Sequence, residues 1–436
     1  MIKFYSRTDF YTICKVCVCI VMLLVGEDAM SQERARYTLD SLQSMARNRY
    51  PQTRQLLLAS RKGDESIKVI ESNWLPKTNV VGTASYQSEV SSVSLPESIP
   101  ASIESPKKDQ YKIGLELSQL IFDGGASATS KTIEQLNLKS ETNRIEGELL
   151  TVKSTVNDLF LGLLINEESF KALANMKKDL IARYDNIEAA VNSGTTLRST
   201  MRELEAEMIG VDQQMVENKA ERLTLLSTLS FLVQEELDAF TVFELPEVEQ
   251  PSFEKEVSLR PEYRQLSTQM ELVDYRNELI DRGNRPRLSL FGNGYFGRPG
   301  LDFFNNDFRL YGMAGLSLSW NVGGYYTSTH QKKKNLIDKE LAQNQIELFE
   351  IRTKSQLTEQ EIEIRKLQEL IVKDSSVEQI RTEVKEVAAV QYENGSITTT
   401  DYILKLNAET QAIITSSMHR IQLVMAYINY NTILGK

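Results

Sequence analysis

The chain has 436 residues and is acidic, with 60 Asp and Glu against 50 Lys and Arg and a pI near 5.2. This charge balance argues against a nucleic-acid partner, because such a partner requires a basic surface. Apolar residues make up 41% of the sequence, which is enough for a sizeable core.

Residues 1–31 have the features of a secretory signal peptide. Basic residues precede an apolar run at residues 16–26, and small residues near Ser31 suit a cleavage site. The run is too short to span a bilayer as a helix. All three cysteines lie in this segment, so we expect no disulfide and no thiol chemistry in the mature chain. Val18, just before Cys19, also argues against a lipid anchor.

Residues 32–233 are interpreted as a first structural repeat. A helical pattern over residues 37–73 is followed by a turn that contains Pro76. Alternating apolar and polar residues then predict two strands, at residues 78–88 and 111–121. A Gly-Gly pair follows and opens a long helical run that is broken only near Gly194.

Residues 260–436 are interpreted as a second repeat, joined to the first by an acidic linker at residues 234–259. The expected strands are residues 288–296 and 310–320. No proline or glycine then occurs from Tyr325 to Asn394. As a helix this run would reach about 100 Å, longer than a compact domain is wide. We therefore predict a long antiparallel helical hairpin with its tip near Gly395.

The spacing of prolines and glycines supports the repeat. Pro51 precedes Pro76 by 25 residues, and Pro261 precedes Pro286 by 25. The motif IFDGG ends one strand pair and WNVGG ends the other. Each repeat is therefore expected to run helix, strand, strand, long helix, turn, helix.

The four strands fit membrane-spanning strands in length and alternation. In hydrocarbon every backbone group must be paired, so the strands must close into a barrel. The smallest such barrels need eight strands, so closure demands oligomerisation. The side chains predicted to face lipid are Ile113, Leu115, Leu117, Leu316 and Leu318. Trp74 and Trp320, at the helix–strand junctions, are predicted to form an interfacial belt. A set of soluble hairpins is the alternative.

Catalytic and cofactor motifs are weak. Gly292 to Gly297 matches a dinucleotide-binding pattern, but a loop with Pro299 follows where a helix is required. His330 and His419 are the only histidines and are far apart in sequence. We therefore expect no enzyme activity, no cofactor and no metal.

The sequence resembles the TolC-like outer-membrane efflux proteins over essentially the whole mature chain. The resemblance rests on IFDGG and WNVGG after the strands, on Pro76 and Pro286, and on the tip turns NSGTTLRST and YENGSITTTDYIL. It implies a mixed α/β membrane protein, in which long antiparallel helical hairpins form a coiled-coil tube. Four transmembrane strands per chain would complete a 12-stranded barrel as a homotrimer. The tube would extend into the periplasm from the outer membrane of a Gram-negative bacterium.

The resemblance also implies a function. Such a tube is a passive exit duct for small molecules, joined through a periplasmic adaptor (membrane fusion protein) to an inner-membrane pump of the RND or ABC type. Outer-membrane lipid would surround the strands. Protein export through a type I secretion system is the first alternative, and a structural coiled-coil or adhesin protein is the second. The amphipathic strands disfavour the second alternative.

The same resemblance implies roles for individual residues at the hairpin tips. The adaptor-docking tips would be Gly194, Thr195, Gly395 and Ser396. The periplasmic gate candidates are Tyr392, Asp401, Ser199 and Thr200. The sequence departs from the family pattern at three positions, where Leu404 replaces a second gate aspartate, Ile397 a gate arginine and Thr200 the aspartate partner of the tyrosine. The gate is therefore expected to be built differently. An alternative role for Asp401 is to start the last helix, because Asp favours helix N-termini.

Overall fold

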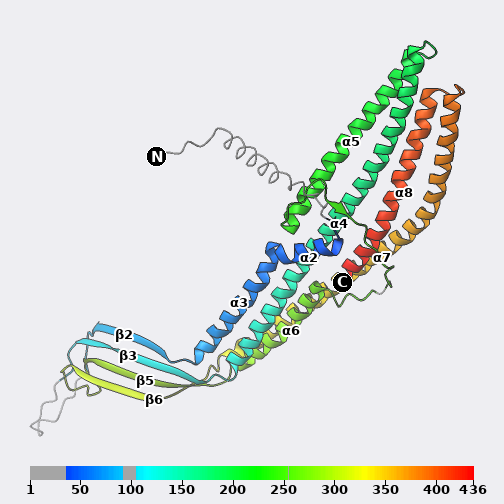
Figure 1. The fold of residues 1–436 in the computed structure, drawn as a ribbon. Helices are drawn as coiled ribbons and strands as arrows, with labels where there is room; N and C mark the ends of the chain where they lie inside the picture. The colour runs from blue at the N-terminus through cyan, green and yellow to red at the C-terminus, as the bar shows by residue number, and fades with distance from the viewer. Residues whose placement is uncertain (1–35, 92–104, 254) are drawn as a thin grey trace, which may run out of the picture. The chain divides into compact units, whose positions relative to one another are not determined.

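The computed structural model describes residues 36–91, 105–253 and 255–436 (Figure 1). The predicted signal peptide lies outside these residues. The chain divides into two compact units, and each draws on both sequence repeats. Among the described residues, the unit called here the tip unit comprises those within Met1–Ala46, Thr155–Val248 and Leu367–Met425. The sheet unit comprises those within Arg47–Ser154, Glu249–Lys366 and Ala426–Lys436. Within the described ranges, no helix is both long enough and apolar enough to cross a membrane.

The elements follow the predicted order in both halves. In the first half they are β1 (Arg36–Tyr37), α2 (Leu39–Arg49), α3 (Pro51–Glu71), the 3-10 turn η1 (Ser72–Trp74), β2 (Lys77–Tyr86), β3 (Asp109–Phe122), α4 (Ala126–Asn192) and α5 (Arg198–Val233). In the second half they are β4 (Val242–Phe243), α6 (Pro261–Gly283), β5 (Arg287–Arg298), β6 (Arg309–Ser319), α7 (Gly324–Glu393) and α8 (Thr399–Ile433). Each end of the four long strands lies one or two residues from its predicted position.

Two prolines begin helices rather than interrupt them. Pro51 and Pro261 each occupy the first turn, after a residue with extended backbone. At this position the missing N–H costs nothing and the fixed φ suits the helix. The single helical pattern at residues 37–73 is therefore two helices, α2 and α3, separated at Tyr50.

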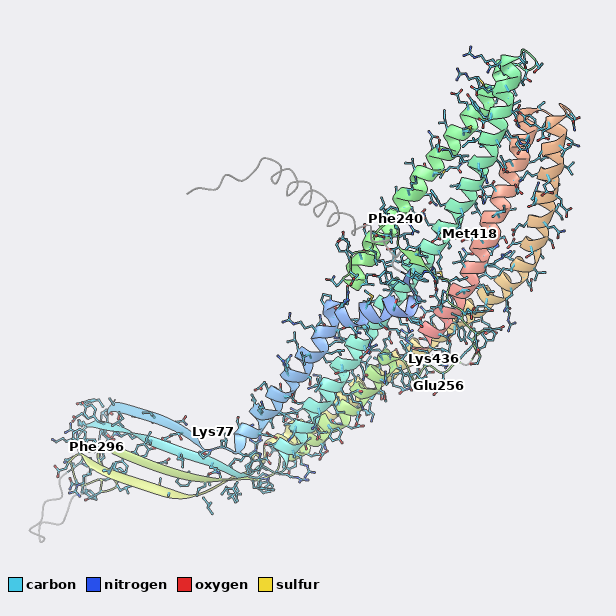
Figure 2. The ribbon with its side chains drawn as sticks, in the orientation of Figure 1. Lys77, Phe240, Glu256, Phe296, Met418 and Lys436 are labelled. Carbon is cyan, nitrogen blue, oxygen red and sulfur yellow. The ribbon has the colours of Figure 1, made fainter. Side chains whose placement is uncertain are left out.

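The strands form one antiparallel sheet in the order β2-β3-β5-β6 (Figure 1). The register aligns Val80, Leu115, Gly294 and Gly312 across the four strands. Lys77 lies at the end of the sheet near the helices and Phe296 toward the other end (Figure 2). Because directly paired residues share a face, this register decides which side chains lie together.

The glycine pairs after the strands make the turns into α4 and α7. Asp123 accepts hydrogen bonds from the backbone N–H groups of Gly125 (2.9 Å) and Ser127 (2.6 Å), which caps α4. Gly124 has a φ of +71°, and a Cβ there would lie 2.6 Å from the Cβ of Arg285. These contacts explain why the sequence has Asp-Gly-Gly at this turn.

The core of the tip unit lies between α4, α5, α7 and α8. Its largest fully buried side chain is Tyr402 of α8. Nine buried residues form this cluster: Leu173, Met176, Leu180, Leu204, Val211, Ala388, Tyr402, Ile403 and Leu406. The two helical hairpins therefore pack against each other near their tips.

The acidic linker adds a small element to the same unit. Its strand β4 pairs in parallel with β1, and Phe243 packs edge-on against Phe160 of α4 at 5.6 Å between ring centroids. Arg222 of α5 donates a hydrogen bond to the carbonyl oxygen of Thr241 (2.8 Å). The start of the linker is thus held against the first hairpin.

Candidate functional site

The sheet has one apolar face with no described element packed over it. The five side chains predicted to face lipid share this face, because the register pairs Leu115 and Leu117 with Gly294 and Gly292. Ile113, Leu115, Leu117, Leu316 and Leu318 are between 40% and 72% exposed. Exposed leucines in one continuous patch mark a surface that contacts something apolar.

The other face of the sheet is polar. Glu116 accepts a hydrogen bond from the hydroxyl of Tyr295 at 2.5 Å, and Lys112 lies over the ring of Tyr295 at 4.7 Å. Asn293 pairs with Glu116 across the two strands. Strands with one apolar and one polar face suit a sheet between lipid and water.

Both tryptophans lie where helices meet strands. Trp74 ends η1 just before β2 and is 39% exposed. Trp320 follows β6, and its indole N–H donates to the carbonyl oxygen of Asn284 at 2.9 Å. An amphipathic ring at this level suits a membrane–water interface, and the belt stays a prediction.

The two hairpin tips have the same backbone structure. Gly194 and Gly395 have φ of +76° and +68°. The backbone N–H of Thr195 donates a hydrogen bond to the carbonyl oxygen of Ala190 (2.9 Å). In the same way, the backbone N–H of Ser396 donates to the carbonyl oxygen of Gln391 (2.8 Å). This bond, with a left-handed glycine before it, is the Schellman motif that ends helices.

The tip glycines are open to solvent. A Cβ added at Gly194 or Gly395 would meet nothing within 4 Å. Thr195 and Ser396 are exposed as well. The four predicted docking residues therefore lie on accessible turns.

Asp401 takes part in a capping box at the start of α8. Its carboxylate accepts hydrogen bonds from the hydroxyl (2.7 Å) and the N–H (3.2 Å) of Thr398, and its own N–H donates to the Thr398 hydroxyl (3.1 Å). This reciprocal arrangement satisfies two backbone donors of the first turn. The hydrogen bonds from the Thr398 hydroxyl and backbone lower the pKa of the Asp401 carboxyl. Helix capping is therefore observed, and a gate role stays a prediction.

The hydroxyl contact and the ring stack of Tyr392 both lie within its own hairpin. Its hydroxyl lies 3.2 Å from that of Thr399, and its ring stacks on Tyr402 with centroids 5.2 Å apart. Among the described residues, no hydrogen bond joins the side chains of Ser199 or Thr200 to Tyr392, and their gate role stays a prediction. Ile397 packs against the apolar cluster.

Other residues link the two hairpins at this level. Arg183 of α4 forms an ion pair with Glu393 of α7 and lies over the ring of Tyr402 at 5.5 Å. Glu203 of α5 accepts a hydrogen bond from the Thr400 hydroxyl (3.2 Å). These contacts tie the first hairpin to the second close to both tips.

Farther from the tips the links continue. Asn407 of α8 donates to Glu207 of α5 at 2.9 Å. Lys385 of α7 bridges Asp179 of α4 (3.2 Å) and the buried Glu409 of α8 (3.1 Å). Sequence analysis identified none of these linking residues. Glu203 and Glu207 are four residues apart on α5. This spacing shows that they share a helix face, but it does not show which residues they contact.

The structure places His419 and the dinucleotide-like glycine pattern within the described part of the chain. No three His, Cys, Asp or Glu residues there are grouped to hold a metal ion. Nδ1 of His419 instead lies 2.6 Å from a carboxylate oxygen of Asp374. Gly292 and Gly297, the ends of the dinucleotide-like pattern, both lie within β5.

Comparison with known families matches residues 42–233 to the family model described as outer membrane efflux protein. None of the curated proteins matches the chain in sequence.

Solved structures match the fold over nearly all of the chain. The Campylobacter jejuni CmeC outer membrane channel is 16% identical with a TM-score of 0.69, over 91% of this chain and 85% of that chain. The open state of the Neisseria gonorrhoeae MtrE outer membrane channel is 14% identical with a TM-score of 0.69, over 91% and 88%. The outer membrane protein VceC of Vibrio cholerae is 13% identical with a TM-score of 0.68, over 90% and 95%. The predicted fold class, long helical hairpins with four antiparallel strands, is confirmed.

Proposed function

We propose that this chain, which belongs to the outer membrane efflux protein family through residues 42–233, is the outer-membrane exit duct of a tripartite efflux system. It would conduct small molecules passively, after an inner-membrane pump has expelled them. The observation that carries the proposal is the four-stranded sheet with one exposed apolar face and one polar face. A sheet of this kind places lipid on one side and an aqueous path on the other.

The sheet of one chain is incomplete by itself. Its edge strands β2 and β6 each have a neighbour on one side only. Unpaired backbone groups cost several kcal/mol each in hydrocarbon, so the edges must pair with other copies. Three copies would supply twelve strands, and we propose a homotrimer in which β2 of one chain pairs with β6 of the next.

Apolar stripes on the tip unit support the same assembly. Ile209, Val216 and Leu223 recur every seven residues on α5, and each is more than half exposed. On α7 a second exposed stripe follows three- and four-residue steps, at Val377, Ile380, Val384 and Val387. Stripes with this spacing bury themselves against another helix. The proposed partners are α5 and α7 of neighbouring copies, which would close a helical tube in the periplasm.

The open tip turns are the proposed docking site for a periplasmic adaptor, the membrane fusion protein that connects the duct to an RND or ABC pump. Gly194 and Gly395 mark these turns, and their surroundings are free of other side chains. The linked hairpins around Arg183 and Glu393 would form the closed gate beside the docking site.

Cysteine cross-linking tests the assembly. The three native cysteines all lie in residues 1–31, so pairs introduced elsewhere can be followed without background. Thr83→Cys on β2 is combined in turn with Met313→Cys and Ser317→Cys on β6, because all three positions lie on the polar face. We expect one pair to give a covalent three-chain species. Thr83→Cys with Leu316→Cys, on opposite faces, is the matched control. Failure of both polar-face pairs to link chains, with only monomer in detergent, would refute the trimer.

A further inference from the structure

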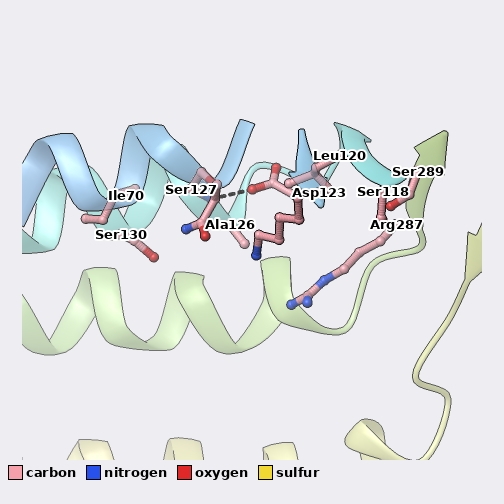
Figure 3. Close-up of a pocket in the computed structure, with 11 residues that line it drawn as sticks. Ile70, Ser118, Leu120, Asp123, Ala126, Ser127, Ser130, Arg287 and Ser289 are labelled. Carbon is pink, nitrogen blue, oxygen red and sulfur yellow. Dashed lines mark hydrogen bonds between the residues drawn. The ribbon is translucent and has the colours of Figure 1, made fainter. Parts of the chain in front are cut away.

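A polar pocket lies in the sheet unit where the strands meet the helices. Its volume is about 350 Å³, and it is lined by residues of α3, β2, β3, α4 and β5. Figure 3 shows Arg287 and Ser289 of β5 next to Ser118 of β3, with Asp123 and Ser127 beside them. The volume is at the low end of the range for small-molecule sites.

Two cations line the pocket without a partner. Neither Lys77 nor Arg287 forms an ion pair with another described residue. Both belong to the polar face of the sheet, because Lys77 pairs with Ser118 and Arg287 pairs with Ser319. The two positive charges are therefore available to a ligand that enters from that side.

The carboxylates near the pocket are already engaged. Asp123 is 5% exposed and accepts the backbone N–H groups of Gly125 and Ser127. Glu71, next to the lining residue Ile70, forms an ion pair with Lys131 at 2.6 Å. Glu116, two residues from Ser118, accepts the hydroxyl of Tyr295. The lining holds two cations, Lys77 and Arg287, against one carboxylate, Asp123, so the charge of the pocket is positive.

Hydroxyl groups complete the donor set. Ser118 and Ser289 line the pocket, and within the described ranges their hydroxyls have no hydrogen-bond partner. A hydroxyl can donate one hydrogen bond, a lysine three and an arginine five. Planar or tetrahedral oxyanions accept several such bonds at once, and arginine matches them in a bidentate manner.

We propose that this pocket binds an oxyanion, either inorganic phosphate or a phosphate or carboxylate group carried by a solute. Lys77 and Arg287 supply the charge, and Ser118 and Ser289 supply hydrogen bonds. The ligand comes from solution rather than from a lipid headgroup, because the pocket opens on the polar face, opposite to the apolar face around Leu115. If the proposed trimeric duct is correct, three copies make a cationic ring along the path of the transported molecules.

Isothermal titration calorimetry with inorganic phosphate tests the site on the purified protein in detergent. Low ionic strength is used, because salt screens exposed charges. We expect saturable binding of one phosphate per chain, and affinity at least tenfold weaker in Lys77→Gln and in Arg287→Gln. Arg287→Lys, which keeps the charge, should retain most of the affinity. Arg309→Gln is the matched control, because it removes one charge from the same face at the far end of the sheet.

Three results would overturn the proposal. They are the absence of saturable binding in the unaltered protein, an equal loss in Arg309→Gln, and full affinity in Arg287→Gln. Nanodiscs distinguish the source of the oxyanion: binding in phosphatidylcholine that disappears when phosphatidylglycerol is added would show a headgroup site instead. Calorimetry measures binding and does not require a conducting channel. Phosphate binding can therefore be observed even if the proposed duct function is wrong, and it can be absent even if the duct function is right.

Discussion

Leu115→Arg is the most direct test that the apolar face contacts lipid. Leu115 lies six residues from Asp109 and seven from Phe122, the two ends of β3. At about 3.4 Å per residue and a tilt of about 40°, it lies roughly 15–18 Å from either end, close to the middle of the layer. The side chain is 55% exposed in the single chain, so an arginine there is accommodated sterically and its cost is that of a charge in lipid.

An arginine at the midplane of such a sheet costs about 2–4 kcal/mol. This corresponds to about a 30- to 700-fold change in the folding equilibrium per chain. A trimer carries three copies, so about 6–12 kcal/mol is expected per assembly. The assay is denaturant unfolding in lipid vesicles, followed by tryptophan fluorescence and by trimer mobility on gels.

The matched control is Asn293→Arg. Asn293 is the neighbour of Gly294, which pairs with Leu115, so it has nearly the same depth and the opposite face. We expect a loss below about 1 kcal/mol, because residues on the aqueous face change selectivity more than stability. Equal destabilisation by the two arginines would refute the assignment of faces.

The remaining predictions concern the hairpin tips. Arg183→Gln should raise channel conductance in planar bilayers, because it removes the ion pair with Glu393. Since this pair is partly exposed, the free energy of unfolding should fall by no more than about 1 kcal/mol. Asp401→Asn should lower the melting temperature at pH 7 because it weakens the box with Thr398. Hydrogen bonds from Thr398 lower the folded pKa of Asp401. Its contribution to stability is therefore present above the unfolded pKa and is lost as pH falls through the folded pKa. Gly395→Trp should leave trimer assembly intact and abolish efflux, measured as substrate accumulation in cells.

Controls separate these effects from general damage. Arg202→Gln breaks an exposed pair within α5 and should leave conductance unchanged; an equal increase would contradict a lock at Arg183. For Asp401, reduced cation selectivity without any loss of stability would favour the gate role over the cap. Gly395→Asn tolerates the positive φ, so efflux lost equally in this variant would point to the turn itself rather than to a blocked docking surface.

The strands, the faces of the sheet and the positions of the tips were predictable from the sequence. Alternation over residues 111–121 reports which side chains share a face, since the strand period is two. Gly194 and Gly395 report the tips, because a left-handed residue that ends a helix is usually glycine. These signals are local: each depends on neighbours within a few residues, and no knowledge of distant segments is required.

Only the tertiary structure decided which distant side chains meet. The hydroxyl of Tyr392 contacts that of Thr399, within the same hairpin. Arg183 instead pairs with Glu393, more than 200 residues later, and so links the two hairpins. Helical periodicity gives the face of a residue but not its partner, because the rotation and axial shift between two long helices set the pairing. The pocket between Lys77 and Arg287 has the same origin, since it requires two sequence repeats to fold into one sheet.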